Sequence, residues 1–443
     1  MKDPLIVREF ESITSQEQDK TKYGDHCIPA KEFAELTTFI YEFDSGKNDQ
    51  SDVLEFMKIG YRRNVGDVIT ARNYVGLIQL KSGYQVQIFP KIEFTDGVSD
   101  IDKTKEVFLS MLKSMKEFKG KLFNTANLKA QRMNLYEVFI NMYIQEVRRL
   151  VKHGIKSDYV RSEDNLNCFK GKLLVNQHVR TNISHKERFY VAFDEFHPNR
   201  PENRIVKATL QKLQRLTESA ENSKGISQLL SAFEMVDPSV NFAKDFSNVV
   251  ISRNTEDYEN LMMWSKVFLM NKSFSTFSGI TTSRALLFPM EKVYEDYVAM
   301  YMKKIFGKDG WNVSTQDKGY YLFEEPRKRF KLRPDIVIKK GSRVVVLDTK
   351  WKKLNKDAGN NYGISQADMY QMYAYSKKYK TSDIWLLYPL SDVMRGHDEI
   401  CYKSADNTVV QIHFVDVDKI TDSLNELKNK IEISVNDEYG AVL

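Results

Sequence analysis

Apolar residues near the start of the chain follow a strand-like spacing. Residues 74–80 and 84–90 are rich in β-branched and aromatic side chains, and Lys81-Ser82-Gly83 lies between them. In the second run, Val86 and Ile88 alternate with glutamines. Two such runs around a glycine turn predict a β-hairpin. We therefore expect residues 1–104 to form an N-terminal β-rich domain of mixed structure.

The pattern becomes helical in residues 105–275. Apolar side chains recur there at three- and four-residue spacing, first at Phe108, Met111, Leu112 and Met115 and again at Leu135, Phe139 and Met142. The second helix is expected to end near Gly154, and a third to begin at Pro201, because proline suits the first helical position. This spacing predicts a central helical domain.

One part of this central region is different in pattern. Phe169–Val175 and Arg188–Phe193 are β-rich, and the polar, basic stretch His178–Glu187 lies between them. The pattern predicts a long β-hairpin, at about residues 173–193, that protrudes from the helices and has residues 178–187 at its tip.

The last third, residues 276–443, combines both spacings. An amphipathic helix is expected at Met290–Phe306 and another at about Ser365–Lys378. Four runs have strand-like composition: Gly319–Phe323, Asp335–Lys339, Arg343–Asp348 and Asp383–Tyr388. This order predicts a mixed sheet flanked by helices. The whole chain is thus expected to be an α/β (α+β) multidomain protein.

Composition and charge limit the class of protein. The 443 residues are 42% hydrophobic and 28% charged, values typical of soluble globular proteins. The apolar runs are too short to span a bilayer, and the first residues lack the pattern of a secretory signal, so we expect a cytoplasmic protein without membrane contact. The formal net charge of +6 suits a nucleic-acid partner.

Two kinds of site are excluded by motif. The three cysteines, Cys27, Cys168 and Cys401, lie far apart and form no CxxC pair, which argues against a zinc or iron–sulfur site. The chain contains no G-x-x-x-x-G-K-[ST] loop. Any nucleotide hydrolysis in its biology must therefore come from another subunit.

The candidate chemistry lies in Pro334-Asp335-Ile336-Val337-Ile338 and Val345-Val346-Leu347-Asp348-Thr349-Lys350, two predicted strands joined at Lys340-Gly341-Ser342. A two-residue turn at Gly341-Ser342 places Asp335 opposite Asp348. If the turn shifts by one residue, the two carboxylates become diagonal neighbours, and a larger shift separates them. In the first two registers they share a face with Lys350.

Two carboxylates at this distance repel each other unless a cation lies between them. Mg²⁺, with Mn²⁺ as a substitute, prefers such oxygen ligands and retains water or phosphate in its shell. The metal would polarise a phosphodiester and activate a water molecule, while Lys350 orients the water or neutralises the developing charge. The D/E-x-K pattern alone is weak evidence, because it also occurs at Glu117-Phe118-Lys119 and Glu426-Leu427-Lys428.

Residues on the flanking helices extend this candidate site. Glu295, on the helix before the hairpin, is a candidate third metal ligand, and Glu291 competes with it one turn earlier. Gln371 and Tyr375 lie four residues apart and share a helix face, from which they can hydrogen-bond Lys350 or the DNA backbone. Five basic residues before Asp335 are candidate phosphate contacts: Arg327, Lys328, Arg329, Lys331 and Arg333.

These segments resemble the McrC subunits of McrBC-type restriction systems, within the PD-(D/E)xK nuclease superfamily. The most specific part is Leu332–Val337 followed by Val346–Lys352 and Asp368–Tyr375. Four other segments are also similar to the family: Asn73–Gly76, Phe89–Ile92, Phe169–Leu173 and Asn199–Ile205.

The resemblance implies a metal-dependent DNA endonuclease subunit that cleaves foreign, often cytosine-modified, double-stranded DNA. Its partner is a hexameric, GTP-hydrolysing McrB-like AAA+ ring, which it contacts through the protruding hairpin and stimulates. The resemblance also implies a homodimer through the nuclease domain. Asp335, Asp348 and Lys350 match the family's catalytic positions. On the hairpin, the candidate ring contacts are Arg180, His185, Lys186 and Arg188.

Some features depart from the family, and other functions stay open. Residues before about 105 exceed the smallest members in length, so residues 1–104 are expected to be an additional domain that binds a partner or DNA. Glu295 is not shared by every member, and some relatives read unmodified DNA. One alternative is a stand-alone RecB-like repair or recombination nuclease, because the spacing of Gln371 and Tyr375 also occurs there. Another is a non-catalytic regulator of an AAA+ ring, against which the intact acidic and basic set argues.

Overall fold

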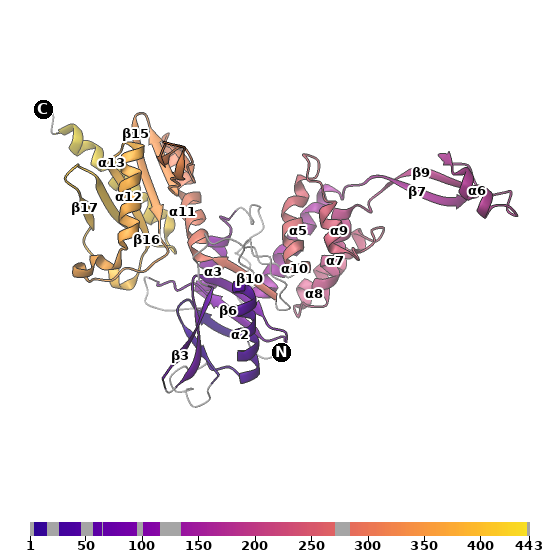
Figure 1. The fold of residues 1–443 in the computed structure, drawn as a ribbon, viewed down its shortest axis with the longest axis horizontal. Coiled ribbons are helices and arrows are strands. Elements are labelled where there is room, and N and C mark those ends of the chain that lie inside the picture. Colours follow the sequence, from indigo (N-terminus) through magenta and orange to yellow (C-terminus); the bar gives the residue numbers. More distant parts are fainter. Residues whose placement is uncertain are drawn as a thin grey trace. The chain divides into compact units, whose positions relative to one another are not determined.

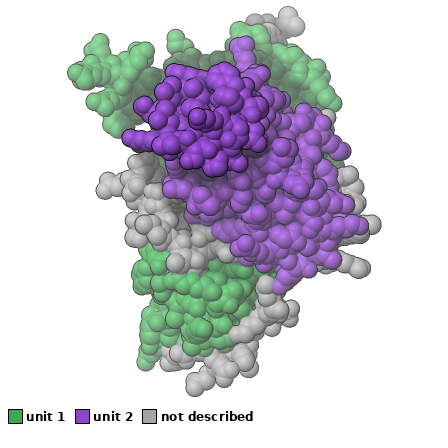
Figure 2. Space-filling view, turned by 90° about the vertical axis from the view of Figure 1, so that its right-hand side faces the viewer, with its two compact units in different colours: residues 1–120, 124–132, 274–443 green, residues 121–123, 133–273 purple. Residues whose placement is uncertain are grey.

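A computed structural model describes residues 4–15, 26–45, 56–63, 65–94, 101–115, 134–270 and 284–440. The chain forms two compact units, coloured separately in Figure 2. Unit 1 comprises residues 1–120, 124–132 and 274–443, and unit 2 comprises residues 121–123 and 133–273. The division into three domains stays a prediction. Its first boundary, at residue 104, falls inside helix α3, and its second, at 275, lies outside the described residues.

The N-terminal part of unit 1 contains a four-stranded sheet in the order β1-β6-β5-β10. Its strands are β1 (Leu5–Arg8), β5 (Tyr74–Gln79), β6 (Gln85–Phe89) and β10 (Arg284–Pro289). The predicted β5–β6 hairpin is confirmed, with Gln79 paired to Gln85. Gly76 is required on β5, since a Cβ there would lie 1.9 Å from the Leu286 carbonyl oxygen of β10.

A smaller sheet and two helices complete this part. The sheet has the order β2-β4-β3. The elements are β2 (Ser12–Thr14), β3 (Met57–Arg62), β4 (Gly66–Ala71), α2 (Ala30–Ser45) and α3 (Ile101–Leu112). The apolar stripe predicted on α3 is buried, including Phe108, Met111 and Leu112. These buried side chains are part of the hydrophobic core of the N-terminal part.

The C-terminal part of unit 1 contains the predicted mixed sheet, with six strands in the order β11-β14-β15-β16-β18-β17. The strands are β11 (Asn312–Thr315), β14 (Ile336–Lys340), β15 (Arg343–Thr349), β16 (Asp383–Pro389), β17 (Cys401–Lys403) and β18 (Val409–Val415). β15, β16 and β18 run parallel, and the other pairs are antiparallel.

Helices flank this sheet, as the sequence predicts. They are α11 (Met290–Phe306), α12 (Gln366–Tyr379) and α13 (Ile420–Gly440). Val337 and Val346 on the sheet form one buried core with Met372 and Tyr375 of α12. Because side chains alternate along a strand, the face that carries Val337 and Val346 also carries residues 335 and 348. The sheet therefore presents residues 335 and 348 toward α12.

Unit 2 is a helical body with a β-stranded arm (Figure 1). The body consists of α5 (Leu135–His153), α7 (Pro201–Gln214), α8 (Ala220–Ala232), α9 (Phe242–Ser247) and α10 (Glu259–Met270). The helix predicted to end at Gly154 does so, with a φ of +88° at that glycine, and α7 begins at Pro201 as expected. The helical prediction for this region is confirmed.

The arm differs from the predicted hairpin. β9 (Phe189–His197) pairs along its length with β7 (Asp158–Leu166), whereas β8 (Lys172–Leu173) adds only two residues. A short helix, α6 (Val175–Thr181), occupies part of the expected tip. The prediction missed β7 because its sequence, Asp-Tyr-Val-Arg-Ser-Glu-Asp-Asn-Leu, is mostly polar and lacks apolar alternation.

Candidate active site

The β14–β15 hairpin has the first of the three predicted registers. Lys340 pairs with Arg343, so Gly341-Ser342 is the turn, and Gly341 has a φ of +60°. At the other end Ile336 pairs with Leu347. The next position on each strand is therefore Asp335 and Asp348, which lie across from each other on the face toward α12.

The environment of both carboxyl groups disfavours a negative charge. Asp348 is 2% exposed. Burial, and next the charge of Asp348, raise the pKa of Asp335 to about 7, although its Oδ2 accepts hydrogen bonds from the Thr349 amide at 2.8 Å and the Thr349 hydroxyl at 2.6 Å. Burial also raises the pKa of Asp348. One buried and one half-buried acid, both with raised pKa values, form a site that a cation would stabilise.

Lys350 provides a positive charge at this site. Its Nζ lies 2.7 Å from Asp348 Oδ2 and 3.6 Å from Asp368 Oδ1, and it donates to Gln371 Oε1 at 3.2 Å. Burial alone would lower the pKa of Lys350, but the neighbouring carboxylates, Asp348 first, raise it above the ordinary value. The lysine side chain is therefore protonated, as an ammonium ion, at neutral pH.

Helix α12 contributes three polar side chains to this centre. Gln371 accepts from Lys350 and donates through Nε2 to the Tyr375 hydroxyl at 2.7 Å. Tyr375 is 1% exposed, and burial raises the pKa of its hydroxyl. The two predicted residues thus form a chain from the core to the ammonium group. Asp368 was missed, although its position one turn before Gln371 is a signal that the sequence contained.

Glu295 lies on α11 and is electrostatically linked to the same centre. Burial, and next the charge of Asp335, raise the pKa of Glu295. Its Oε1 accepts from Gln316 Nε2 at 2.5 Å and lies 3.1 Å from Lys292 Nζ. The pKa of Glu9, just after β1, is raised mainly by burial, and the competing Glu291 adds to that shift instead. Of these two glutamates, the structure thus associates Glu295 with the aspartates.

The fit to a divalent cation comes from Asp335 and Asp348. Within the described ranges, no group of three or more His, Cys, Asp or Glu side chains is arranged to hold a metal ion, so Glu295 does not complete a three-ligand cage with the aspartates. Mg²⁺ characteristically takes one or two carboxylates and fills its shell with water and phosphate oxygens. The two opposed acids, each with a raised pKa, suit that mode of binding.

The predicted phosphate contacts lie on a small separate hairpin. It consists of β12 (Tyr321–Phe323) and β13 (Arg329–Lys331), and the chain then continues toward Asp335. Four of the five basic side chains belong to this hairpin, Arg333 lies two residues after it, and all five are exposed: Arg327, Lys328, Arg329, Lys331 and Arg333. Lys328 and Lys331 lie 5.9 and 5.5 Å from the ring centroid of Tyr321. The hairpin therefore carries several exposed basic side chains, together with Glu324 and Glu325, shortly before Asp335 in the sequence.

The predicted partner contacts lie near the end of the arm and are exposed: Arg180, His185, Lys186 and Arg188. A buried amide holds this end together. Asn182 exchanges two 2.8 Å hydrogen bonds with Asn165 and lies 3.0 Å from His178 Nδ1. Three apolar side chains are exposed beside the basic ones: Val175 at 60%, Val179 at 57% and Ile183 at 73%. This mixture of apolar and basic side chains is typical of a protein-binding surface.

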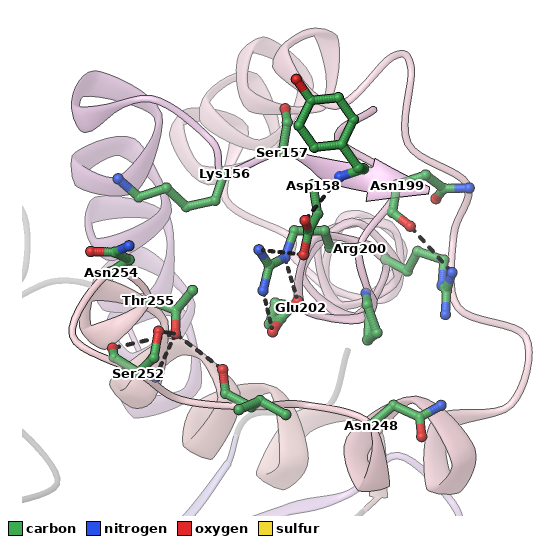
Figure 3. A pocket seen from close by; sticks show the side chains of 14 residues that line it. Lys156, Ser157, Asp158, Asn199, Arg200, Glu202, Asn248, Ser252, Asn254 and Thr255 are labelled. Carbon is green, nitrogen blue, oxygen red and sulfur yellow. Dashed lines mark hydrogen bonds and ion pairs between the residues drawn. The ribbon is translucent and has the colours of Figure 1, made fainter. Parts of the chain in front are cut away.

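A pocket of about 830 Å³ lies in unit 2, where the arm meets the helices (Figure 3). Its main charges are already paired. Arg200 lies 3.2 Å from Glu202 and 3.4 Å from Asp158, the first residue of β7. Arg204 lies 2.5 Å from Asp245. We interpret this network as the attachment of the arm to α7, because its cations are already neutralised by carboxylates.

In the described part of the chain, no helix has the length and apolar character to cross a membrane.

Comparison with known proteins identifies the family. A chain in the refined half-complex from the tetradecameric assembly of Thermococcus gammatolerans McrB AAA+ hexamers with bound McrC is 21% identical, with a TM-score of 0.71. The match covers 96% of this chain and 100% of that one, so the two share a fold.

A chain in the cryo-EM structure of the Thermococcus gammatolerans McrBC complex is 19% identical, with a TM-score of 0.49, and the match covers 69% of this chain and 88% of that one. No curated protein matches the chain. The family model for the McrBC 5-methylcytosine restriction system component matches residues 69–389, well over half of the sequence. The chain therefore belongs to the family of McrBC 5-methylcytosine restriction system components.

Proposed function

We propose that this chain is the DNA endonuclease subunit of an McrBC-type restriction complex, and that it hydrolyses phosphodiesters with Mg²⁺. The observation that carries the proposal is the position of the Lys350 ammonium group, 2.7 Å from Asp348 and on the strand face that it shares with Asp335. Such a set of charges is expensive to bury in a protein that only binds a partner.

The chain's own residues have separate roles in the proposed hydrolysis. Asp335 and Asp348 would hold the metal ion, and Glu295 would act on it through its charge or a water molecule. Mg²⁺ supplies Lewis acidity toward the phosphate and lowers the pKa of a bound water. Lys350, kept protonated by its carboxylate neighbours, is unsuited to act as a base and instead neutralises charge that develops on the phosphate oxygens. Gln371 fixes the direction of the ammonium group.

The basic β12–β13 hairpin would bind the backbone of double-stranded DNA. Its four exposed cations, and Arg333 just after it, precede Asp335 in sequence, and phosphate contacts of this kind set position without reading sequence. A homodimer through the nuclease part would bring one such site to each strand. These assignments fit a restriction nuclease that works in the cytoplasm.

The motor would be a second protein. The chain lacks a P-loop, and the structurally similar chain comes from an assembly of McrB AAA+ hexamers with bound McrC. We assign the arm, with Arg180, His185, Lys186 and Arg188 around exposed Val179 and Ile183, as the contact with a GTP-hydrolysing McrB-like hexamer. Binding there would stimulate hydrolysis and drive cleavage.

Plasmid cleavage in Mg²⁺, with and without the ring partner and GTP, tests this proposal. We expect cleavage only when partner and GTP are both present. Cleavage by the chain alone would favour a stand-alone repair nuclease. Stimulated GTP hydrolysis without any cleavage would favour a pure regulator of the ring.

A further inference from the structure

Lys350 lies just after the end of β15, in a stretch of residues that belongs to no helix or strand. This lysine segment, residues 350–353, has two backbone hydrogen bonds: the Lys350 amide donates to the Leu387 carbonyl at 2.9 Å, and the Lys352 amide donates to the Lys350 carbonyl at 2.9 Å. A segment outside regular structure depends on side-chain contacts for a fixed geometry. Those contacts determine how firmly the Lys350 ammonium group is held.

The first contact comes from the other end of the sequence. The Trp351 indole Nε1 donates to Glu9, at 3.2 Å from Oε1 and 3.0 Å from Oε2. Glu9 is completely buried, and its Oε2 also accepts from the Lys91 amide at 3.2 Å. The carboxyl group therefore joins the N-terminal sheet to the residue directly after Lys350.

A second glutamate holds the far end of the segment. Glu93 Oε1 forms an ion pair with Lys353, and its Oε2 accepts from the Asp392 amide at 2.6 Å. The Glu93 carbonyl oxygen accepts from Arg395 Nη2 at 3.3 Å. Glu93 thus ties the lysine segment to the loop that follows β16, the parallel neighbour of β15 in the sheet.

The fold explains why the two glutamates act together. β1 and β6 run parallel, with Arg8 opposite Phe89. Glu9 directly follows β1, and Glu93 lies four residues after Phe89, so both leave the same end of neighbouring strands. This end of the N-terminal sheet forms a platform for the lysine segment. The segment is then held at Trp351 and at Lys353, with one residue between them.

Trp351 also contacts helix α11, which carries Glu295. Its ring lies 5.2 Å from the ring of Tyr294, which is fully buried on α11 next to Glu295. The helix α11 itself begins where β10, a strand of the N-terminal sheet, ends. The Met290 amide at that junction donates to the Asn73 carbonyl at 2.9 Å. The same sheet therefore borders both Lys350 and the helix of Glu295.

The chemistry of Glu9 argues for a positional role. Burying a carboxyl group away from water carries a free-energy cost, which an apolar side chain at position 9 would avoid. An apolar side chain would, however, leave the indole N–H of Trp351 without this acceptor. The arrangement therefore gives up some stability for a defined position of Trp351.

We propose that the N-terminal sheet is a positioning element of the nuclease centre, in which Glu9 and Glu93 hold residues 350–353 so that the Lys350 ammonium group stays against Asp348. The inference rests on the proposed nuclease function for its effect on cleavage. It gives the N-terminal region a role in the active site itself, besides any binding of a partner or DNA.

Four variants of the full chain test this. Glu9→Leu removes the acceptor, Glu9→Gln retains one, Trp351→Phe removes the donor, and Lys353→Met removes the second tie. Glu35→Leu is the matched control, because Glu35 also accepts a backbone hydrogen bond, from Ser82, but does so within the N-terminal part. Each variant is first checked by circular dichroism and thermal unfolding.

Cleavage is measured in single turnover with partner, GTP and Mg²⁺, and DNA affinity by anisotropy. We expect Glu9→Leu, Trp351→Phe and Lys353→Met to lower the cleavage rate at least fivefold with DNA affinity changed less than twofold. Glu9→Gln and Glu35→Leu should stay within about twofold of the native rate. Equal losses in Glu9→Gln and Glu9→Leu, or none in any variant, would overturn the inference.

A second measurement needs no cleavage. Brief acetylation with acetic anhydride, read by peptide mass spectrometry, reports the accessibility of Lys350 relative to exposed Lys403. We expect Lys350 to react at least threefold faster in Glu9→Leu and Trp351→Phe than in the native chain or Glu35→Leu. Unchanged reactivity in folded variants overturns the positioning role. If the native chain does not cleave DNA at all, the proposed function fails, and the acetylation result still decides this inference.

Discussion

Thr349, the residue between Asp348 and Lys350, holds Asp335 in place through both its backbone amide and its hydroxyl group. The middle residue of the D-x-K motif is thus part of the site. Because both donors favour the charged form of Asp335, they counteract the burial and repulsion that raise its pKa.

Removing the hydroxyl donor should therefore raise the pKa of Asp335 further. We predict that Thr349→Val lowers single-turnover cleavage at pH 7 about tenfold, since a hydrogen bond to a charged group contributes about 1.5–3 kcal/mol. The loss should be greatest at low pH and shrink as the pH rises, because Asp335 must lose its proton to hold a cation. Thr349→Ser, which retains the hydroxyl, is the control. Equal rates for Thr349→Val and the native chain at every pH would contradict this role.

The relay from Tyr375 through Gln371 to Lys350 predicts a graded effect on helix α12. Gln371→Met should lower cleavage about tenfold or more with DNA affinity unchanged, because the ammonium group loses the acceptor that directs it. Tyr375→Phe should lose only a few-fold, because Gln371 itself remains. A larger loss in Tyr375→Phe than in Gln371→Met would contradict the order of this relay.

The basic β12–β13 hairpin predicts a salt-dependent effect on DNA binding. Each phosphate contact adds about 0.9 to the slope of log affinity against log salt for duplex DNA. Lys328→Ala with Lys331→Ala should weaken binding and lower that slope by up to about 2. Lys403→Ala, an exposed lysine on the edge strand β17, should leave the slope unchanged. An unchanged slope in the double variant would remove the hairpin from the DNA contact.

The buried Glu9 predicts a pH dependence of stability. Burial raises its pKa from 4.5 to about 8. Between pH 4.5 and 8 the folded state keeps a proton on Glu9 that the unfolded state has released. The contribution of Glu9 to the free energy of unfolding is therefore complete below about pH 4.5 and is lost as pH rises toward 8. Glu9→Gln cannot titrate. Its free energy of unfolding, compared with that of the native chain, should therefore rise with pH across this window, by at most about 1.4 kcal/mol per pH unit. A difference that stays constant from pH 5 to 8, measured by urea unfolding, would contradict the buried position of Glu9.

The spacing of apolar residues along the chain predicted the helices and strands that depend on residues close together in the sequence. The continuous apolar runs on β14 and β15, with glycine at the turn, predicted the hairpin but left three registers open, and the structure has the one in which Asp335 lies across from Asp348. The amphipathic spacing of residues 290–306 gave α11 with its observed ends. Helix α11 buries one face, so its apolar spacing has the period of a helix, whereas β14 and β15 are buried on both faces and therefore have continuous apolar sequences.

Other parts depend on contacts that no local pattern contains. β7 is mostly polar, so its pairing with β9 leaves no apolar alternation in the sequence. Glu9 and Trp351 are separated by 342 residues, and only the folded chain brings them together. The sequence showed Asp335, Asp348 and Lys350, whereas the part of Asp368 and the support around Lys350 required the structure.

The central claim is that Asp335, Asp348 and Lys350 form one hydrolytic centre, and Asp348→Asn tests it most directly. This substitution keeps the shape of the side chain but removes the charge that pairs with Lys350 at 2.7 Å. With ring partner, GTP, Mg²⁺ and plasmid, we predict at least a thousandfold loss of cleavage, while DNA binding and stimulation of GTP hydrolysis remain within about twofold of the native chain. Native cleavage by Asp348→Asn would contradict the account.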